Sequence, residues 1–599
     1  MRSEGTYRLR VFLGGCLLGA VCFVLIYGVR ILNPTYDDWL LLGDMDLKQH
    51  YIGFCHYRVS SWQFPIGLIE TLSYPNKMSV IYTDSIPGLA VLFKLFAYVL
   101  PQKFQYFGLA GLLSFILTGG FAGLLLYRFL GNTIASVIYS LFFIVSYPVI
   151  QRMYYHTALA SHWILLAALC LWLYQEELSV RTRVLLWSGF GFLCVSIHSY
   201  FLPMVGLILL CAAVDESLTF RAQQDYAASF KPEEEIGGKK EKAKKTEKEG
   251  KDRAEDKRGR KSKYSQIDRT DNRTIWASIK IGIGELLGFC ASAILALFIY
   301  GGFYGSSSAV GEGLGTFTSN LNTFVNPLDD GRLYGSLPTY NGFRYEGFGY
   351  LGGGILLLLM TGMVATGVKY FLAQNNNRIF HKDHLPIIEA ALFAVTCMLS
   401  MFPIVTLNDK KLFGVPYPGF VRKLLGIFRS NGRFIWTAVY LLMLLAITLC
   451  YRIFKQKLQF LYYILTILAL GLQAYDISGM LAGKHDYFAK EQTYSCFWED
   501  ENELSNGRKG FVFLYNENDI LMDTAYFAYL NGMWQNNYYY ARDINPVIDQ
   551  NVEEWKETLL NGFVRSDIIY IFRQQDASPE LLEGLRTFSL RDHIIAIKK

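Results

Sequence analysis

The carboxyl-terminal part of this 599-residue sequence lacks a glycine-rich phosphate-binding loop, and the whole chain lacks a convincing internal repeat. The first absence argues against nucleotide binding in that part. The second argues against a symmetric transporter, in which polar residues and broken helices of paired halves meet near the middle of the membrane. The spacing of cysteines and histidines typical of a zinc site is also missing.

Ten cysteines are present, and most lie in or beside long apolar stretches. We expect these to pack as small apolar residues. Only Cys55 and Cys496 are expected outside the membrane, and their separation along the chain makes a disulfide between them a weak prediction. The cysteines therefore do not indicate a metal centre.

Long apolar runs are what the sequence has in abundance, since 52% of its residues are hydrophobic and 16% are aromatic. A helix of roughly 20 residues is needed to cross a bilayer, so we predict a polytopic α-helical membrane protein with about 11 spans. The first run has no cleavage site after it, which predicts an uncleaved span with a cytoplasmic N-terminus. The predicted spans are residues 11–32, 106–127, 133–150, 159–174, 184–201, 204–214, 275–300, 350–370, 387–407, 434–450 and 460–474.

Residues 86–100 form a short apolar block that Lys94 interrupts and prolines bound. If this block does not cross, Arg128 and the basic insert at 221–272 both lie in the cytoplasm, as the positive-inside bias favours. We therefore predict a re-entrant or interfacial helix. The loops rich in polar and aromatic residues then emerge together on the extracytoplasmic face.

The sequence divides into a membrane module, residues 1–474, and a soluble extracytoplasmic α/β domain, residues 475–599. Within the module, residues 33–105 form a large first outer loop. The insert at 221–272 alternates basic and acidic residues with almost no apolar ones, which predicts a disordered cytoplasmic segment. It has few aromatic residues for base stacking, so no nucleic-acid partner is expected.

The carboxyl-terminal domain alternates strand-like and helix-like stretches, which predicts a small, mainly parallel α/β fold. The predicted strands are residues 511–515, 537–541, 567–572 and 593–597, and the predicted helices are residues 522–532, 552–562 and 578–585.

The first outer loop holds the most informative polar residues. Asp46 and His50 have helical spacing and would share one face of a helix. Asp46 is then a candidate base, alone or orienting His50, and Asp84 is a further candidate. The alternative is that Asp46 caps a helix, His50 bonds a loop carbonyl, and Asp84 starts the helix after it.

The motifs DLKQHYIGF, WQFPIG, YTDSIPG, HSYF, NLNTFVNP, YEGFGYLG and FRSNGRF resemble an uncharacterised bacterial branch of the GT-C superfamily of membrane glycosyltransferases. The resemblance implies that a sugar passes from a polyprenyl-phosphate donor to an acceptor outside the bacterial cytoplasmic membrane, usually with inversion. It places Asp46 as the catalytic carboxylate of the first loop, with Asp37 and Asp38 as competing candidates.

Inverting transfer needs one base and positive charge to stabilise the departing phosphate, whereas a hydrolase needs two carboxylates flanking the bond. We expect Arg433 and Arg429 to bind the donor phosphate, because guanidinium offers planar paired donors. Arg58 and His198 are second choices. The alternative for the arginines is contact with lipid headgroups.

Several other polar residues are candidates for binding sugar or acceptor hydroxyls, with turn formation as the alternative. His156 and His162, near a span end, are expected to be interfacial anchors. The scheme requires no cofactor or metal, although some members of the superfamily use a divalent ion beside the first-loop acid, and the acids here leave room for one. The sugar and acceptor candidates are Glu346, Arg344, Asn322 and Trp62, with Asn320 and Asn326 beside them.

The expected partners are a polyprenyl-phosphate sugar donor, membrane lipids, and an envelope glycan or protein as acceptor. Two other functions stay open. One is a transporter or flippase of lipid-linked glycans, which needs a polar route through the bilayer. The other is a membrane-anchored protein whose carboxyl-terminal domain binds envelope components.

Overall fold

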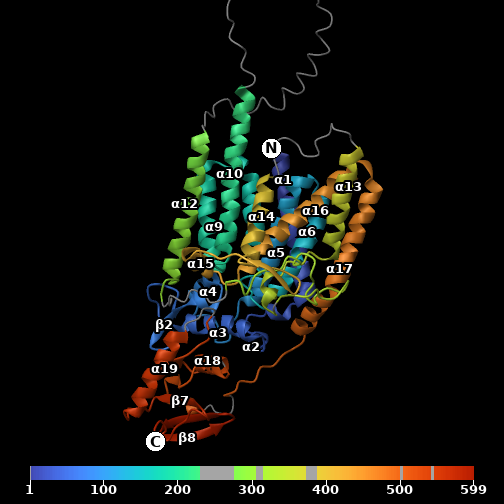
Figure 1. Cartoon of the computed structure of the whole chain (residues 1–599). Coiled ribbons are helices and arrows are strands. Elements are labelled where there is room, and N and C mark those ends of the chain that lie inside the picture. Colours follow the sequence, from blue (N-terminus) through green and yellow to red (C-terminus); the bar gives the residue numbers. More distant parts are fainter. Residues whose placement is uncertain are drawn as a thin grey trace, which may run out of the picture.

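The computed structural model describes residues 2–228, 275–304, 314–340, 342–372, 387–498, 503–517, 519–540 and 545–599. Long helices form a bundle, with the carboxyl-terminal domain at one end and the N-terminus at the other (Figure 1). The first outer loop lies at the same end as that domain. The predicted disordered insert lies outside the described residues from residue 229, and residues 221–228 are the last turns of a helix.

Seven helices in the described ranges are long and apolar enough to cross a membrane, as a polytopic helical membrane protein requires. The predicted number of about 11 is not reproduced, because α6 and α8 have 12 residues each and α14 has 15. The seven are α1 (Arg2–Tyr27), α5 (Phe107–Leu130), α9 (Val180–Ile197), α10 (Phe201–Ala228), α12 (Ile275–Tyr300), α16 (Ile435–Lys457) and α17 (Gln459–Ala489). The other helices of this part of the chain are α6 (Thr133–Ile144), α7 (Tyr147–Arg152), α8 (Trp163–Tyr174), η3 (Gln175–Glu177), α13 (Gly353–Leu372), α14 (Ile387–Met401) and α15 (Gly419–Gly426).

Helices α1 and α5 pack against each other through glycine. A Cβ at Gly15 would lie 2.1 Å from the carbonyl oxygen of Gly119, and one at Gly19 would lie 2.2 Å from that of Phe115. Small residues at such positions let two helix backbones approach closely, as is common between membrane helices. This contact fixes the first helix against the bundle.

A buried ion-pair group ties three helices together at the end opposite the first outer loop. Arg183 of α9 donates to both carboxylate oxygens of Glu216 in α10, at 2.8 and 2.5 Å, and to Glu285 in α12, at 2.8 Å. The Arg183 side chain is 3% exposed and that of Glu285 is fully buried. The guanidinium therefore neutralises a carboxylate that lies within an apolar helix.

The first outer loop folds into short elements and does not span. They are η1 (Arg30–Leu32), α2 (Asp38–Leu41), α3 (Met45–Val59), an antiparallel pair of β1 (Leu68–Ser73) with β2 (Asn76–Ser79), η2 (Val80–Thr83) and α4 (Pro87–Lys94). Helix α4 has only eight residues, fewer than a helix needs to cross a bilayer, as expected for a re-entrant or interfacial segment. The ammonium of Lys94 lies over the rings of Tyr57 and Trp62, at 4.2 and 4.7 Å.

The carboxyl-terminal domain contains a five-stranded sheet in the order β6-β5-β7-β9-β8, with helices α18 (Leu521–Leu530) and α19 (Asn545–Leu560). The α/β class is confirmed, but the sheet is mixed: β5 pairs in parallel with β6 and β7, while β9 is antiparallel to both β7 and β8. The strands are β5 (Gly510–Phe513), β6 (Trp534–Gln535), β7 (Ile568–Arg573), β8 (Leu585–Leu590) and β9 (His593–Lys598).

Three features of this region differ from the predictions. Helix α17 runs to Ala489 and so passes the predicted domain boundary at 475. The predicted helix at 578–585 is a series of turns that leads into β8, and Gly584 there has a φ of 74°, which ends helical geometry. The predicted strand at 537–541 is not a strand in the residues that are described.

The carboxyl-terminal domain docks on the first outer loop through buried polar contacts. Asp37 is fully buried and accepts hydrogen bonds from Tyr51, at 2.8 Å, and from Tyr526 of α18, at 2.7 Å. Asp38 accepts from the backbone N–H of Tyr494 at 2.9 Å. Both carboxylates are occupied by this interface, so neither is retained as a candidate base.

The Arg183 group generates a stability prediction. Replacing Arg183 with Met leaves two glutamates without their cation inside the bundle, which we expect to destabilise the fold by about 3–5 kcal/mol. Denaturant titration of the purified protein in detergent measures the change. The double variant Arg183→Met/Glu285→Gln should recover part of the loss, and an unchanged unfolding midpoint for Arg183→Met would contradict the assignment.

Candidate functional site

Helix α3 brings the first two site residues together. Its N-terminus is capped by Asp44, which accepts the backbone N–H of Leu47 at 3.0 Å. The predicted helical spacing of Asp46 and His50 is therefore confirmed. One turn later, a Cβ at Gly53 would lie 2.4 Å from the Cβ of Thr83, so η2 lies directly against α3.

Asp84 ends η2 in the left-handed region, with a φ of 51°. The hydroxyl of Ser85 donates to the carbonyl of His50 at 2.6 Å, which holds this turn on α3. Burial raises the pKa of the Asp84 carboxyl to about 6, and the charges of His156 and Arg433 limit that rise. Asp84 does not begin a helix, since the first residue of α4 is Pro87.

His156 follows α7 and supplies the partner of Asp46. Its Nε2 lies 3.2 Å from Asp46 Oδ2, and its backbone N–H donates to the carbonyl of Arg152 at 2.8 Å. Asp46 therefore pairs with His156 and does not orient His50. The expectation that His156 is an interfacial anchor is also wrong, since its imidazole contacts a site carboxylate. Burial alone would raise the pKa of Asp46, but the hydrogen bond and charge of His156 hold it below its usual value.

His198 lies between α9 and α10 and faces Asp84. Its Nδ1 accepts the backbone N–H of Tyr200 at 3.2 Å, which leaves Nε2 to donate toward Asp84 Oδ1, 3.4 Å away. Burial and the nearby Arg433 charge lower the pKa of His198 well below its usual value. We refer to Asp46, His50, Asp84, His156 and His198 as the acid–imidazole group.

His50 is the most deeply enclosed member of this group. Its side chain is fully buried, its ring centroid lies 5.6 Å from that of His156, and neither of its ring nitrogens has a hydrogen-bond partner. Burial and the charge of His156 lower the pKa of His50 to about 3, so the imidazole is neutral. Together with Asp84 and His156, it forms the one group in the described ranges whose ligand atoms are spaced to hold a metal ion.

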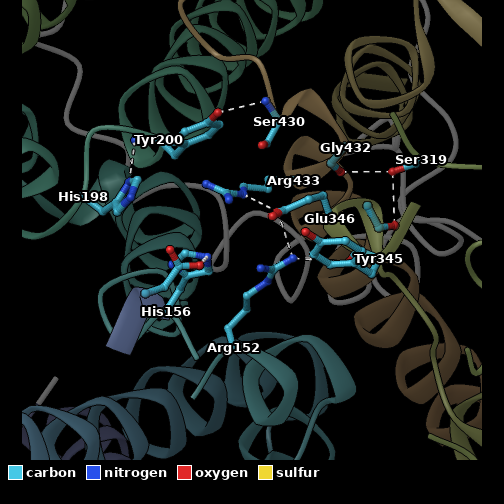
Figure 2. Close-up of polar contacts among 12 residues, drawn as sticks. Arg152, His156, His198, Tyr200, Ser319, Tyr345, Glu346, Ser430, Gly432 and Arg433 are labelled. Atoms are coloured by element: carbon cyan, nitrogen blue, oxygen red, sulfur yellow. Dashed lines mark hydrogen bonds and ion pairs between the residues drawn. The ribbon is translucent and has the colours of Figure 1, made fainter. Parts of the chain in front are cut away.

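A second group lies beside the first and consists of Arg152, Glu346 and Arg433, which we call the arginine–glutamate group. Oε2 of Glu346, in η4 (Gly342–Gly347), accepts from Arg433 Nε at 2.7 Å and from Arg152 Nη2 at 2.9 Å. Arg433 lies in η5 (Asn431–Phe434) and stacks on the ring of Tyr200 at 4.5 Å. Figure 2 shows the two arginines meeting at Glu346, with His156 and His198 close by.

The arginine–glutamate group carries one surplus positive charge, because two guanidinium groups share one carboxylate. Burial alone would raise the pKa of Glu346, but the two arginines hold it well below its usual range, so it is ionised. Arg152 is only 1% exposed, and its Nε and Nη1 have no hydrogen-bond partner. A buried guanidinium with unused N–H groups is suited to binding an anion.

Glycines next to the charged residues let η4 and η5 touch. A Cβ at Gly347 would lie 2.2 Å from the Ser319 hydroxyl, and one at Gly432 would lie 2.5 Å from the carbonyl oxygen of Phe317. The Ser319 hydroxyl contacts the carbonyls of both glycines, at 3.2 and 3.0 Å (Figure 2). The strand pair β3 (Ile404–Leu407) and β4 (Lys410–Gly414) lies nearby, since the backbone N–H of Leu321 donates to the carbonyl of Thr406 at 3.0 Å.

Several predicted site residues are used elsewhere. Arg58 donates to four main-chain carbonyls of residues 97–102, at 2.9 to 3.3 Å, which leaves it no role at a phosphate. Trp62 is 47% exposed and lies beside Lys94. His162 is fully buried, 4.4 Å from the ring of Trp436, and so is a core residue and no interfacial anchor. Arg429 is exposed, and its charge acts on Asp84.

The asparagines follow their alternative interpretation as turn residues. Asn322 donates to Asn408 Oδ1 at 2.9 Å and to the carbonyl of Pro338 at 3.1 Å. Asn320 and Asn326 likewise bond main-chain carbonyls. Glu346, predicted to bind hydroxyls, is instead the shared partner of two arginines. The side chain of Arg344 lies outside the described residues.

Sequence reasoning misses Arg152, because its partner Glu346 lies 194 positions away and no local pattern indicates the pair. Helix α7 ends at Arg152, so its spacing of four residues from His156 is not that of neighbours on a helix face. The aromatic surroundings favour an interfacial anchor at this point.

A separate apolar cavity of about 520 Å³ lies beside Arg8, Phe12 and Tyr174, near the N-terminus of α1, and so at the other end of the bundle.

Comparison with known families yields two matches. Residues 16–230 and 267–478 match a family described as a domain of unknown function (DUF6311), and residues 502–598 match the C-terminal domain of the same family. No curated protein and no solved structure matches the chain.

The close approach of η4 and η5 can be tested at Gly432. Gly432→Ala forces a Cβ against the Phe317 carbonyl and the Gly347 Cα, which we expect to destabilise the protein by about 1–3 kcal/mol. Thermal unfolding in detergent measures the loss. Gly284→Ala, in α12 with nothing within 4 Å of the added Cβ, is the control and should be neutral or slightly stabilising. Equal effects of the two substitutions would contradict this account of the site.

Proposed function

We propose that this chain, which belongs to the family described as a domain of unknown function (DUF6311), is a membrane glycosyltransferase. In this proposal a sugar passes from a polyprenyl-phosphate donor to a hydroxyl of an envelope glycan, lipid or protein, with inversion at the sugar. The resemblance to the GT-C superfamily motivates the substrate class. The two groups of site residues support the chemistry.

The single observation that carries the proposal is the surplus positive charge of the arginine–glutamate group beside ionised carboxylates. The phosphate of the donor is a diester with one negative charge, and the departing polyprenyl phosphate gains a second. Fixed positive charge therefore stabilises the transition state more than the bound donor. Arg152 is the strongest candidate contact, because two of its nitrogens are buried and unpaired.

Asp46 is the proposed base. It is ionised, oriented by His156 at 3.2 Å, and 23% exposed, so an acceptor hydroxyl can reach it. In the reaction, Asp46 takes the proton of the hydroxyl as its oxygen forms a bond to the anomeric carbon. The bond from that carbon to the phosphate oxygen breaks on the opposite side, and its electron pair leaves with polyprenyl phosphate. Asp84 and His198 hold the adjacent turn in place.

The position of the site suits a lipid substrate. His198 lies between α9 and α10, and Arg433 immediately precedes α16, so the charged groups gather where apolar helices end. The phosphate of a lipid carrier lies at this level of a membrane. We propose that this face is extracytoplasmic, and that the shorter helices α6, α8, α13 and α14 complete a module of about 11 membrane segments.

Transport of a lipid-linked glycan is the second candidate, and the buried Arg183 group favours it, because charges within membrane helices often mark a transport route. Each charged side chain in that group has an ion-pair partner, however, which is typical of a structural role. Movement of labelled lipid-linked sugar from one leaflet to the other in vesicles that contain the protein, without transfer of the sugar to an acceptor, would favour transport.

The base is tested by Asp46→Asn in the purified protein. We expect sugar transfer to fall by about 10²–10⁴-fold, because the amide cannot accept the proton. Transfer of radiolabelled sugar to acceptor measures the rate. Asp44→Ser is the matched control two residues earlier, since serine keeps the helix cap, and it should retain activity. An active Asp46→Asn protein would refute the assignment.

The phosphate contact is tested by Arg152→Lys. Lysine keeps the charge but loses the planar paired donors, so we expect the KM for the polyprenyl-phosphate donor to rise about 10–100-fold, as for loss of a charged hydrogen bond. Initial-rate kinetics at varied donor concentration measure this. Arg422→Lys, on the exposed face of α15, is the control. A folded Arg152→Lys protein with an unchanged donor KM would exclude this contact.

A further inference from the structure

His50 presents a problem that the proposed reaction does not solve. Its side chain is fully buried, and both ring nitrogens lack a hydrogen-bond partner. Leaving one buried polar group unsatisfied costs about 1–3 kcal/mol. Nearby His56, on the same helix and equally buried, has both nitrogens bonded, at 2.8 Å to Thr71 and at 2.8 Å to Ala525. The position of His50 therefore indicates a bound group that its nitrogens contact.

The neighbours of His50 are the residues that would complete such a contact. One ligand atom each from His50, Asp84 and His156 lies within 4.8 Å of the other two. His156 uses Nε2 toward Asp46, and its Nδ1 is buried without a partner. His198 faces one oxygen of Asp84. His156 and Asp84 thus each have an orienting partner on one side, and each keeps one ligand atom for a metal ion.

We propose that His50, Asp84 and His156 bind a divalent transition-metal ion. Two imidazoles and one carboxylate are a ligand set that zinc accepts with one position open, while magnesium and calcium prefer oxygen ligands alone. Zinc ligands lie about 2.0–2.2 Å from the ion, which puts the ligands of a tetrahedron roughly 3.4 Å apart, so the three ligand atoms close in from separations of up to 4.8 Å. Asp46 then orients His156 from outside, as carboxylates commonly do for metal-binding histidines.

The charges around the three residues are compatible with a cation. Three carboxylates, those of Asp46, Asp84 and Glu346, lie among these buried or half-buried groups beside the two guanidinium groups of Arg152 and Arg433. The carboxylates outnumber the guanidinium groups, which suits a cation. An ordered water is the alternative ligand for His50.

This inference does not depend on glycosyl transfer, because metal binding is measured directly. The full chain is purified in detergent, stripped with EDTA and titrated with Zn²⁺ by calorimetry and with Co²⁺ by visible absorption. We expect one ion per chain and Co²⁺ bands typical of nitrogen and oxygen ligands. His50→Gln and His156→Gln should each weaken Zn²⁺ binding by at least about 100-fold, and Asp46→Asn by about 10–100-fold.

His56→Gln is the matched control, since it removes an equally buried histidine of the same helix and should leave Zn²⁺ affinity unchanged. Elution in detergent and thermal unfolding show whether each variant is folded. Absence of a stoichiometric Co²⁺ signal in the wild-type protein overturns the proposal without any variant. A folded His50→Gln protein with wild-type affinity overturns it equally. Zinc binding in a protein that transfers no sugar would refute the proposed activity and leave the metal site standing.

Discussion

The site depends on the contacts that the Glu346 carboxylate makes with Arg152 and Arg433. Two guanidinium groups are buried beside it, and a buried charge is tolerated only with a partner and hydrogen bonds. The three residues come from segments far apart in the chain, since Arg152 and Glu346 are separated by 194 positions. One carboxylate therefore joins α7, η4 and η5, and the second guanidinium leaves this group with one surplus positive charge among buried residues.

Helix α3 connects this site to the carboxyl-terminal domain. Asp46 and His50, two members of the acid–imidazole group, lie on one face of α3. On the same helix, His56 contacts Ala525 and Gln49 contacts Tyr539, both in the carboxyl-terminal domain. The backbone carbonyl of Gln49 also accepts from the hydroxyl of Tyr538 at 3.0 Å. The described residues of this domain thus hold the helix on which two site residues stand, and none of them is a charged member of either site group.

The sequence predicts those features of the fold that depend on local order. The apolar runs indicate the membrane helices, the spacing of Asp46 and His50 predicts a shared helix face, and the short block at 86–100 predicts a segment that does not cross. Apolar runs alone do not predict the number of long helices, because irregular ends shorten α6, α8 and α14 below the length of the run that contains each of them. An apolar run of membrane length can therefore contain a helix that is several residues shorter.

Partnerships between distant segments could not be predicted in the same way. Asp37 and Asp46 look alike in sequence, yet the first is enclosed by tyrosines of two domains and the second meets His156. Arg58 and Arg433 likewise differ only in what surrounds them: main-chain carbonyls satisfy the first, while the second shares a carboxylate with another arginine. A motif identifies the residue type, but packing decides which charges remain available for chemistry.

The backbone around the site explains why its residues can meet at all. Asp84 adopts a left-handed conformation, and Glu346 and Arg433 each lie next to a glycine whose Cβ would clash with the facing loop. Such irregular segments are stable in apolar surroundings only where protein encloses them and satisfies their polar groups. Apart from Asp46 and His50 on α3, the site is therefore built from short turns at helix ends, where the backbone can direct carboxylates and guanidinium groups toward one another.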